Sequence, residues 1–534
     1  MSAVLTDNLS LVAGAPNGIK KLRELILELA VRGKLVPQDP SDGPASELLK
    51  RITEEKARLV AQGKIKKQKP QPEITDEEKP FQLPTGWEWV RLDSLLKKIG
   101  AGSTPLGGKQ AYVANGVKFL RSQNVWSEGL RLNEVAFIPE ETHQKMSGTH
   151  VEAGDLLFNI TGASIGRCAA VPADFDTGNV SQHVTIIRPV SAATQPFLHT
   201  ALISQSVQQT VMDVQVGVSR EGLSIGKLAQ FLIPFPPEVE QHRIVSKVGE
   251  LMALCDRLEA RQTDADSAHA QLVQALLSAL TQASDAEGFA QSWQRLAEHF
   301  HTLFTTESSI DALEQAFLCL AADGRLVRSY IPADYLALSD VIEGDSLNGS
   351  SKKPQDSPGA VEILRISAGT GVAGYVTDEL EHKWADVSEA EIQKFLLARD
   401  DLLACRFNGN LHYVGAFSLY CGSRGVPQIF PDKLIRFRAD RNKASPHYLK
   451  YILNAAPARA QIESFCATTV GNIGISAKNL KTIKLRLPTL NEQSNIVSRL
   501  DQLMALCDQL KARLNQARQV HEHLASALVE QAVA

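Results

Sequence analysis

Apolar side chains recur at alternating spacings of four and three residues in two long stretches of the chain. The first stripe consists of Ile244, Val248, Leu251, Cys255 and Leu258, and continues through Gln262, Ala265, His269, Leu272 and Leu276. The second consists of Ile496, Leu500, Leu503, Cys507 and Leu510, and continues through Leu514, Ala517, His521, Leu524 and Leu528. A heptad alternation keeps one stripe of a helix facing a partner helix. We therefore expect two long helices, with the first five residues of each stripe in a helix-pair interface.

The two stripes belong to an internal repeat. Glu240–Arg261 and Glu492–Arg513 are identical at 14 of 22 positions at an offset of 252. Ile19–Val36 parallels Ile310–Val327 at an offset of 291. The chain is therefore predicted to contain a short helix, a middle region and a long helix, twice over. A twofold relation between the halves would make the two long helices antiparallel.

Local signals mark the ends of these helices. Thr489 and Glu492 have the spacing of a capping box, and Pro237 precedes an acidic helix start. Gly33 and Gly324 follow the short helices, where a left-handed cap favours glycine. These signals predict where the repeated helices begin and end.

The two middle regions are predicted to be mixed α and β. Short apolar runs such as GDLLFNITG and HVTIIRPV in the first, and DDLLACRFNGN and KLIRFRAD in the second, read as strands separated by turn residues. We predict an α+β protein whose two mixed α/β domains are separated by two long antiparallel helices, a coiled-coil-like spacer. The predicted boundaries are 1–82 (helical region and charged linker), 83–237 (first middle region), 238–330 (central helical region), 331–488 (second middle region) and 489–534 (C-terminal helix).

Composition places few limits on this picture. The 534 residues are 44% hydrophobic and 22% charged, which is ordinary for a globular protein. No apolar run is long enough to cross a membrane, and the N-terminal residues lack a secretory pattern. Seven scattered cysteines form no CxxC pair, so we expect a reducing cytoplasm. A net charge of −4 argues against coating nucleic acid by charge alone, although a local basic groove is compatible with it.

A search for catalytic motifs gives near misses. The loop at 100–110 is similar to a phosphate-binding loop, but Ser103 replaces its first glycine and Gln110 follows Lys109. The sequence FPPE at 235–238 lacks the amide and the aromatic residue of an amino-methyltransferase motif. His299 with His301, and His521 with His523, are spaced i and i+2, so they do not converge on a helix. We therefore expect no catalytic residue, no cofactor site and no metal site in this chain.

Two further features allow alternatives. His269 and His521 occupy equivalent stripe positions, so they either meet across the helix pair or mark where another subunit packs, with metal binding a remoter alternative. The segment at 50–80 is best interpreted as a solvated charged tether. The alternative is that its lysines contact phosphate, namely Lys64, Lys66, Lys67 and Lys69.

The ordered set of motifs resembles the specificity subunit of type I restriction-modification systems. It comprises LPTGWEWVRLDSL at 83–95, a domain that ends in a strand followed by proline, and a helix opening E-Q-x-x-I-V. The segment LKRITEEKARLVAQGKIKKQKPQPEI after RGKLVPQ belongs to the same pattern. The resemblance covers essentially the whole chain, and its elements occur twice around dissimilar domains.

The resemblance implies a function. The middle regions would be target recognition domains, each reading one half of a bipartite, asymmetric sequence in double-stranded DNA. The helices would set the gap between the halves and dock two modification (methyltransferase) subunits. Those subunits would carry S-adenosylmethionine, and restriction subunits with ATP-driven translocation, using ATP and Mg, would join the assembly. The chain would then be a non-catalytic, cytoplasmic subunit with no membrane association.

Candidate DNA contacts are polar and basic residues beside glycine turns, because base edges and phosphates are read by such side chains. In the first middle region they are Ser103, Thr104, Lys109, Arg121, Gln123, Asn124, Arg167, Gln182 and Arg220. In the second they are Lys352, Lys353, Arg365, Arg406, Asn408, Asn410, His412, Arg424 and Asn472. Two rival functions stay open: a non-catalytic assembly scaffold with degenerate DNA recognition, and a self-sufficient DNA methyltransferase or nuclease.

Overall fold

The computed structural model describes residues 8–67, 71–215, 222–327, 335–370, 374–376, 382–422, 425–469 and 472–533. The chain divides into two compact units. Unit 1 comprises Met1–Thr263 and Arg518–Ala534, and unit 2 comprises Asp264–Ala517. Each middle region lies within one unit.

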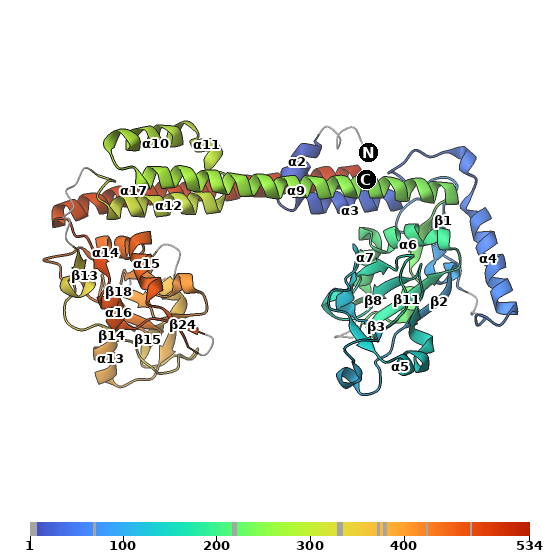
Figure 1. Ribbon diagram of the computed structural model, residues 1–534, viewed down its shortest axis with the longest axis horizontal. Coiled ribbons are helices and arrows are strands. Elements are labelled where there is room, and N and C mark those ends of the chain that lie inside the picture. Colours follow the sequence, from blue (N-terminus) through green and yellow to red (C-terminus); the bar gives the residue numbers. More distant parts are fainter. Residues whose placement is uncertain are drawn as a thin grey trace. The chain divides into compact units, whose positions relative to one another are not determined.

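Two long helices contribute to both units. Helix α9 spans Glu238–Gln282, with 45 residues, and α17 spans Leu490–Val533, with 44 residues (Figure 1). The capping box of α17 is confirmed, since the peptide N–H of Thr489 donates to Glu492 Oε2 at 3.0 Å. Helix α9 begins directly after Pro237, with two acidic residues in its first turn.

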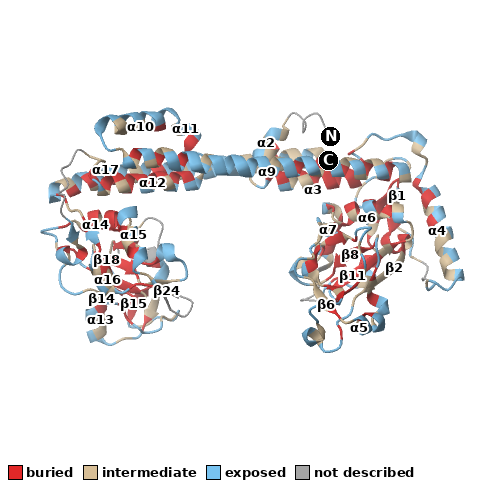
Figure 2. Ribbon diagram, viewed as in Figure 1, coloured by how far each residue is buried: buried red, intermediate tan, exposed pale blue. Residues whose placement is uncertain are grey.

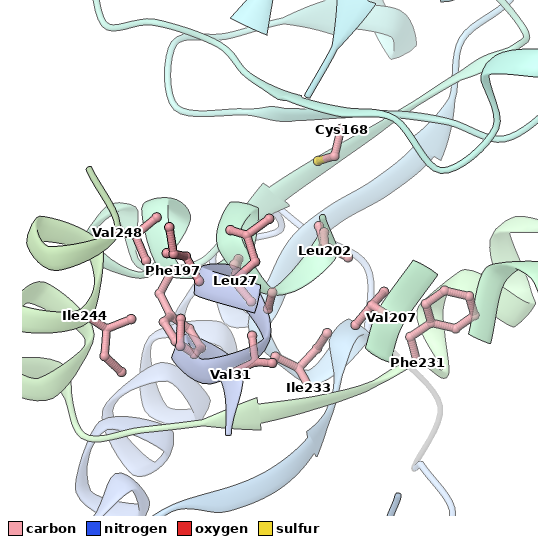
Figure 3. Close-up of a cluster of buried hydrophobic side chains, with 14 of the residues drawn as sticks. Leu27, Val31, Cys168, Phe197, Leu202, Val207, Phe231, Ile233, Ile244 and Val248 are labelled. Atoms are coloured by element: carbon pink, nitrogen blue, oxygen red, sulfur yellow. The ribbon is translucent and has the colours of Figure 1, made fainter. Parts of the chain in front are cut away.

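In unit 1, the short helix α3 (Gly18–Val31) packs with the beginning of α9 and the end of α17 in one buried cluster. Figure 3 shows its centre, where Leu27 and Val31 of α3 lie near Ile244 and Val248 of α9. Gly33 follows α3 with a positive φ of 66°, as the predicted cap requires.

Unit 2 repeats this arrangement with the other ends of the long helices. Helix α12 (Glu307–Ala322) packs with the last turns of α9 and the first turns of α17. Ile496, Leu500 and Cys507 are buried in the same cluster as Val273 and Leu277. The interface residues predicted on α9 and those predicted on α17 therefore lie in different hydrophobic cores. In each core they pack against a short helix as well as against the other long helix.

The heptad stripe is not continuous along either helix, which corrects the sequence prediction. Leu272 and Leu524 are 52% and 46% exposed, whereas the residues that follow them, Val273 and Ala525, are 3% and 0% exposed. A straight α-helix drifts by about 20° per heptad relative to a 3.5-residue repeat. The buried face has therefore moved by one residue between the two ends of each helix.

The first middle region contains two four-stranded sheets, of order β2-β11-β8-β9 and β6-β3-β10-β7. Strands β3 and β10 are parallel, and the other described pairs in these sheets are antiparallel. The strands are β2 (Leu96–Ala101), β3 (Val117–Leu120), β6 (Ala136–Ile138), β7 (His150–Val151), β8 (Leu156–Asn159), β9 (Cys168–Ala170), β10 (Gly178–Val180) and β11 (Val184–Pro189). Smaller pairs are β1 (Glu88–Arg91) with β12 (Leu232–Phe235) and β4 (Val125–Trp126) with β5 (Gly129–Leu130).

The second middle region has the same plan with an added sheet. Its sheets are β14-β22-β18-β20-β16, β17-β15-β21 and the additional β19-β24-β23. The strands are β14 (Leu347–Asn348), β15 (Val361–Leu364), β16 (Tyr375–Val376), β17 (His382–Ala385), β18 (Leu402–Cys405), β19 (Phe407–Asn408), β20 (Phe417–Tyr420), β21 (Gln428–Ile429), β22 (Leu434–Phe437), β23 (Ala467–Thr469) and β24 (Asn472–Gly474). Strand β13 (Leu336–Ala337) pairs with β25 (Lys484–Leu485), as β1 does with β12.

The remaining helices cover the sheets or extend the helical parts. They are α2 (Leu9–Gly14), α4 (Ala45–Ala61), α5 (Glu140–Lys145), α6 (Gln195–Leu202), α7 (Gln205–Gln215) and α8 (Ile225–Ala229) in unit 1, and α10 (Ala286–Glu298), α11 (Phe300–Leu303), α13 (Glu389–Phe395), α14 (Pro446–Leu453), α15 (Ala456–Ser464) and α16 (Ala477–Lys481) in unit 2. Figure 2 shows buried residues along the strands of both middle regions and exposed residues in many of the loops between them. None of the helices described here combines the length and apolar character needed to cross a membrane.

Candidate nucleic-acid interface

Four loops of the first middle region converge beyond the ends of β2, β3, β8 and β10. We call residues 102–104, 121–124, 160–167 and 181–183 loop surface 1. The side-chain amide of Asn159 donates to Ser122 O at 2.9 Å, which ties the end of β8 to the turn after β3. The peptide N–H of Ser103 donates to Val180 O at 3.2 Å. The side chains of Thr161 and His183 are 2.6 Å apart.

Most predicted contacts of the first region lie on this surface. Ser103, Thr104, Gln123 and Gln182 are exposed there, and Arg167 is half-buried. Lys109 is exposed on the short helix at Gly108–Ala111, in the loop between β2 and β3, which is not part of loop surface 1 as defined. The structure therefore brings together residues from four separate loops.

Asn124 and Arg121 have structural partners in the turn after β3. Asn124 is 2% exposed, and its side chain accepts from the Arg121 N–H and donates to Arg131 O. Arg121 donates to Glu134 O at 3.3 Å, and its guanidinium carbon lies 5.9 Å from the centroid of the Tyr112 ring. Asn124 therefore shapes the loop, and we leave it out of the proposed DNA contacts.

A stack of two arginines on one tryptophan was missed from the sequence. The guanidinium carbons of Arg131 and Arg167 lie 3.5 and 3.7 Å from the centroid of the Trp126 ring. The Trp126 indole N–H donates to Gln123 O at 2.8 Å, which anchors the ring to loop surface 1. An aromatic residue close to an arginine in NVWSEGLRL was the available signal.

The loops of the second middle region occupy corresponding strand ends. We call residues 349–353, 365–366, 406–414 and 430–433 loop surface 2. The peptide N–H of Ser350 donates to Phe430 O at 2.8 Å, as Ser103 does to Val180. The peptide N–H of Arg406 donates to Lys433 O at 2.7 Å.

The predicted contacts of the second region divide into exposed and turn-forming residues. Lys352, Lys353 and His412 are exposed, and Arg365 and Arg406 are half-buried. The side chains of the two asparagines serve the turn itself: Asn408 Oδ1 accepts from the Asn410 N–H, and Asn410 Oδ1 accepts from the His412 N–H. Arg220 and Arg424 lie outside the described residues. Asn472 is described only as a backbone position in β24, where it pairs with Thr469.

A looser stack on loop surface 2 corresponds to the Trp126 stack. The Arg406 guanidinium carbon and the Lys433 ammonium lie 4.7 and 5.1 Å from the centroid of the Phe407 ring. Phe407 and Lys433 were also missed from the sequence, because only the pairing of distant strands brings them together.

A buried lysine, Lys450, lies on helix α14 of the second middle region. Lys450 of α14 is 3% exposed, and its ammonium lies 3.7 Å from the Tyr375 ring centroid and 3.5 Å from the Tyr451 ring centroid. Burial lowers the pKa of Lys450 to about 7. The Tyr451 hydroxyl donates to Asp501 Oδ1 of α17 at 2.5 Å. The second middle region is therefore joined to α17 by the hydrogen bond from the buried Tyr451 to Asp501, which is itself exposed.

The surroundings of the stripe histidines and of the linker lysines bear on the alternatives considered above. His269 Nε2 is 3.2 Å from Thr302 O, and His521 Nε2 is 2.8 Å from Leu11 O. Each ring is thus hydrogen-bonded within its own unit, which does not support the alternative that the two rings meet. The linker lysines at 64, 66 and 67 are exposed, and Lys69 lies outside the described residues. Among the residues described, no cluster of three or more metal-ligating side chains occurs.

Comparison with known proteins decides the family. The family model of the type I restriction modification DNA specificity domain matches residues 84–265 and 336–518, one match in each half of the chain. The chain belongs to this family. Each match covers nearly all of one middle region, and we now call these regions the first and second recognition domains.

Similar proteins span nearly the full chain. The specificity subunit of the type I restriction enzyme EcoEI from Escherichia coli is 35% identical over 576 aligned residues, which cover 97% of this chain and 94% of that subunit. The EcoAI specificity subunit, also from Escherichia coli, is 32% identical over 573 residues, with the same coverage. A solved chain from work on assembly and conformational transition of a type I R-M system has a TM-score of 0.52 at 18% identity, and the match covers 85% of this chain and 99% of that one. That likeness concerns the fold alone.

Proposed function

We propose that this chain is the DNA-specificity subunit of a type I restriction-modification complex and reads a bipartite, asymmetric target in double-stranded DNA. Loop surface 1 would read one half of the target, and loop surface 2 the other. The observation that carries the proposal is the repeated frame with unlike loops, because two readers of one design need different side chains to read different half-sites.

The chemistry would be supplied by other subunits. In this proposal two modification subunits carry S-adenosylmethionine, restriction subunits use ATP and Mg, and this chain holds no cofactor and catalyses no reaction. Leu254 and Leu506, at equivalent positions of the repeat, are 36% and 55% exposed on α9 and α17. Equivalent exposed leucines would give two like modification subunits the same apolar contact on each half of the repeat. The assembly would act in the cytoplasm.

The long helices would set the gap between half-sites. At 1.5 Å per residue, a helix of 45 residues is roughly 68 Å long. Adding or removing helical residues in both α9 and α17 should change the number of unread base pairs and leave the half-sites unchanged. A changed half-site with an unchanged gap would contradict this role.

The central experiment is a domain exchange in the complete modification complex. Residues 331–488 are replaced by the corresponding domain of a relative with another target, and methylated adenines are mapped in a host genome before and after. Only one half-site should change. The assembly scaffold with degenerate recognition predicts no preference among duplexes in gel-shift competition, and that result would reject the proposal. Calorimetry of the isolated chain with S-adenosylmethionine tests the self-sufficient methyltransferase, because only that alternative predicts binding.

A further inference from the structure

The Trp126 stack, which adjoins loop surface 1 and shares Arg167 with it, holds two arginine side chains on one ring. Two groups cannot both lie within 3.7 Å of one ring centroid on the same side without overlapping, so Arg131 and Arg167 flank opposite faces of the indole. Adding the two distances places their guanidinium carbons roughly 7 Å apart. The indole therefore fixes the spacing of two positive charges.

The backbone holds all three residues of the stack in place. The Trp126 indole N–H bonds to Gln123 O, and the Arg131 N–H donates to Asn124 O at 2.9 Å. The carbonyl of Arg167 accepts from the Asn159 N–H, also at 2.9 Å. The stack is thus built on the turn after β3 and on the end of β8, which are the parts that form loop surface 1.

Neither guanidinium has a carboxylate within ion-pairing distance among the described residues. Arginines elsewhere in this domain do have such partners: Arg188 pairs with Asp155, and Arg91 with Glu78. Two like charges held close together without a counter-ion repel each other, and anions bound at their donor edges would offset that repulsion. The unpaired donors therefore point to an anionic ligand.

We propose that Arg131 and Arg167, spaced by Trp126, grip two neighbouring phosphates of one DNA strand. Neighbouring phosphates of a B-DNA strand advance about 3.4 Å along the axis, and because the backbone winds around the axis their direct separation is roughly twice that. This matches the spacing of the two guanidiniums. The inference rests on the proposed function and assigns this part of loop surface 1 to register and affinity, while its neighbours read bases.

The test is the salt dependence of binding by the complete modification complex. The probe is a duplex that carries the target found by mapping methylated adenines in the host genome. Each phosphate contact contributes about −0.9 to the slope of log K against log salt. Arg131→Ala and Arg167→Ala should each make the slope shallower by about 0.9, and the double variant by about 1.8, without a change in base preference. The double Arg→Lys variant keeps both charges and should keep the slope.

Two controls separate the possible failures. Lys145→Ala removes an exposed charge of the same domain that already pairs with Glu141, and it should leave the slope unchanged. Trp126→Leu should weaken binding, and Trp126→Phe, which keeps a flat ring, should restore part of it. An unchanged slope in the double Ala variant, or a changed preference at one base with an unchanged slope, would overturn the phosphate grip. Absence of any sequence preference in the wild-type complex would instead overturn the proposed function.

Discussion

The hydrogen bonds that close the β8–β9 loop of the first recognition domain are repeated around the β18–β20 loop of the second. In the first, Asn159 receives the N–H of Gly166 and donates its own N–H to Arg167 O, both at 2.9 Å. In the second, Cys405 receives the N–H of Gly415 at 2.7 Å and donates to Ala416 O at 3.0 Å. The bracketed loops differ: residues 160–165 lie inside the first, and residues 406–414 inside the second. The two domains thus share the backbone hydrogen bonds that close the loop, whereas the residues inside the loop differ in number and kind.

The three additional residues of the second loop have a structural consequence. They allow β19 to form and to pair with β24, which creates a sheet that the described part of the first domain lacks. On the first domain, Arg167, which closes the corresponding loop, lies on the Trp126 ring. The comparison teaches that a fixed pair of strand ends can support a tight stack in one domain and a small sheet with a looser stack in the other, and so can present different chemistry to a ligand.

The strongest test of the common frame is its buried ion pair. Asp155 is 0% exposed and bonds to Arg188 Nε at 2.6 Å, and Asp401 is 2% exposed and bonds to Arg438 Nε at 2.7 Å. Removing one partner of a buried pair costs about 3–5 kcal/mol when the other charge is left uncompensated. Glu152 also contacts the Arg188 guanidinium and keeps part of its charge compensated. Asp155→Ala should therefore reduce the free energy of unfolding by about 3 kcal/mol, the lower end of that range, in chemical denaturation.

Asp401→Ala should cost less than Asp155→Ala, which sharpens the comparison. The Arg438 side chain is 44% exposed and can return to water, whereas the Arg188 side chain is 13% exposed. Arg436, which is 11% exposed and lies 3.9 Å from Asp401, keeps its hydrogen bond to Leu396 O in this variant. Asp176→Ala, which removes a carboxylate that is 63% exposed, serves as the control and should change stability by less than about 1 kcal/mol. Equal losses for all three variants would show that the pair has no special place in the frame.

Lys450 should make the folding stability of the second recognition domain depend on pH. Its pKa of about 7 in the folded protein lies below the ordinary value of 10.5, so the unfolded chain binds more protons between these two pH values. Stability should therefore rise as pH increases from 7 towards 10, by up to about 1.4 kcal/mol per pH unit. Below pH 7 this contribution should stay constant.

Lys450→Met removes the titrating group and should flatten this rise. Denaturation of both proteins at pH 6, 7, 8 and 9 measures the difference between them. The neighbouring Tyr375, Tyr451 and Asp501 remain in the variant, so a rise that persists in Lys450→Met would assign the pH dependence to another group.

Replacing the glycine that closes each loop should destabilise the two domains to different extents, with smaller effects than the changes above. Gly166 and Gly415 have positive φ values of 86° and 70°, which cost a side chain roughly 1–2 kcal/mol. A Cβ at Gly415 would lie 2.4 Å from Cγ2 of the buried Ile462, whereas a Cβ at Gly166 would meet the end of the flexible Gln208 side chain. Gly415→Ala should therefore lower the melting temperature more than Gly166→Ala. The reverse order would mean that the second loop adapts more easily than the first.

Local and repeated features of the fold were predictable from the sequence. The helix starts at Pro237 and Thr489 and the repeat itself depend on neighbouring residues, so the sequence is enough to find them. The exposed Leu272 was not predicted, because the drift of the stripe depends on which short helix packs beside each end of α9. The Trp126 stack was not predicted either, since Arg167 follows Trp126 by 41 positions and only strand pairing joins them.

The smallest expected effect concerns the histidines of the long helices. Leu11 and Thr302, whose carbonyls receive these rings, are separated by 291 residues, the offset of the short-helix repeat, and so occupy equivalent positions. A hydrogen bond of this kind contributes about 1 kcal/mol. His521→Ala should cost about that much, and His269→Ala less, because its bond is longer, at 3.2 Å against 2.8 Å.

The exposed His523 provides the matched control for this last pair, since His523→Ala should leave the denaturation midpoint unchanged. If His269→Ala and His521→Ala were as neutral as the control, the equivalent hydrogen bonds would be a by-product of the repeat. If each lowers stability, the repeat has kept one attachment of a long helix to the segment before a short helix in both units. That attachment would then belong to the common frame, together with the buried Asp–Arg pair and the backbone hydrogen bonds of Gly166 and Gly415 that close the two loops.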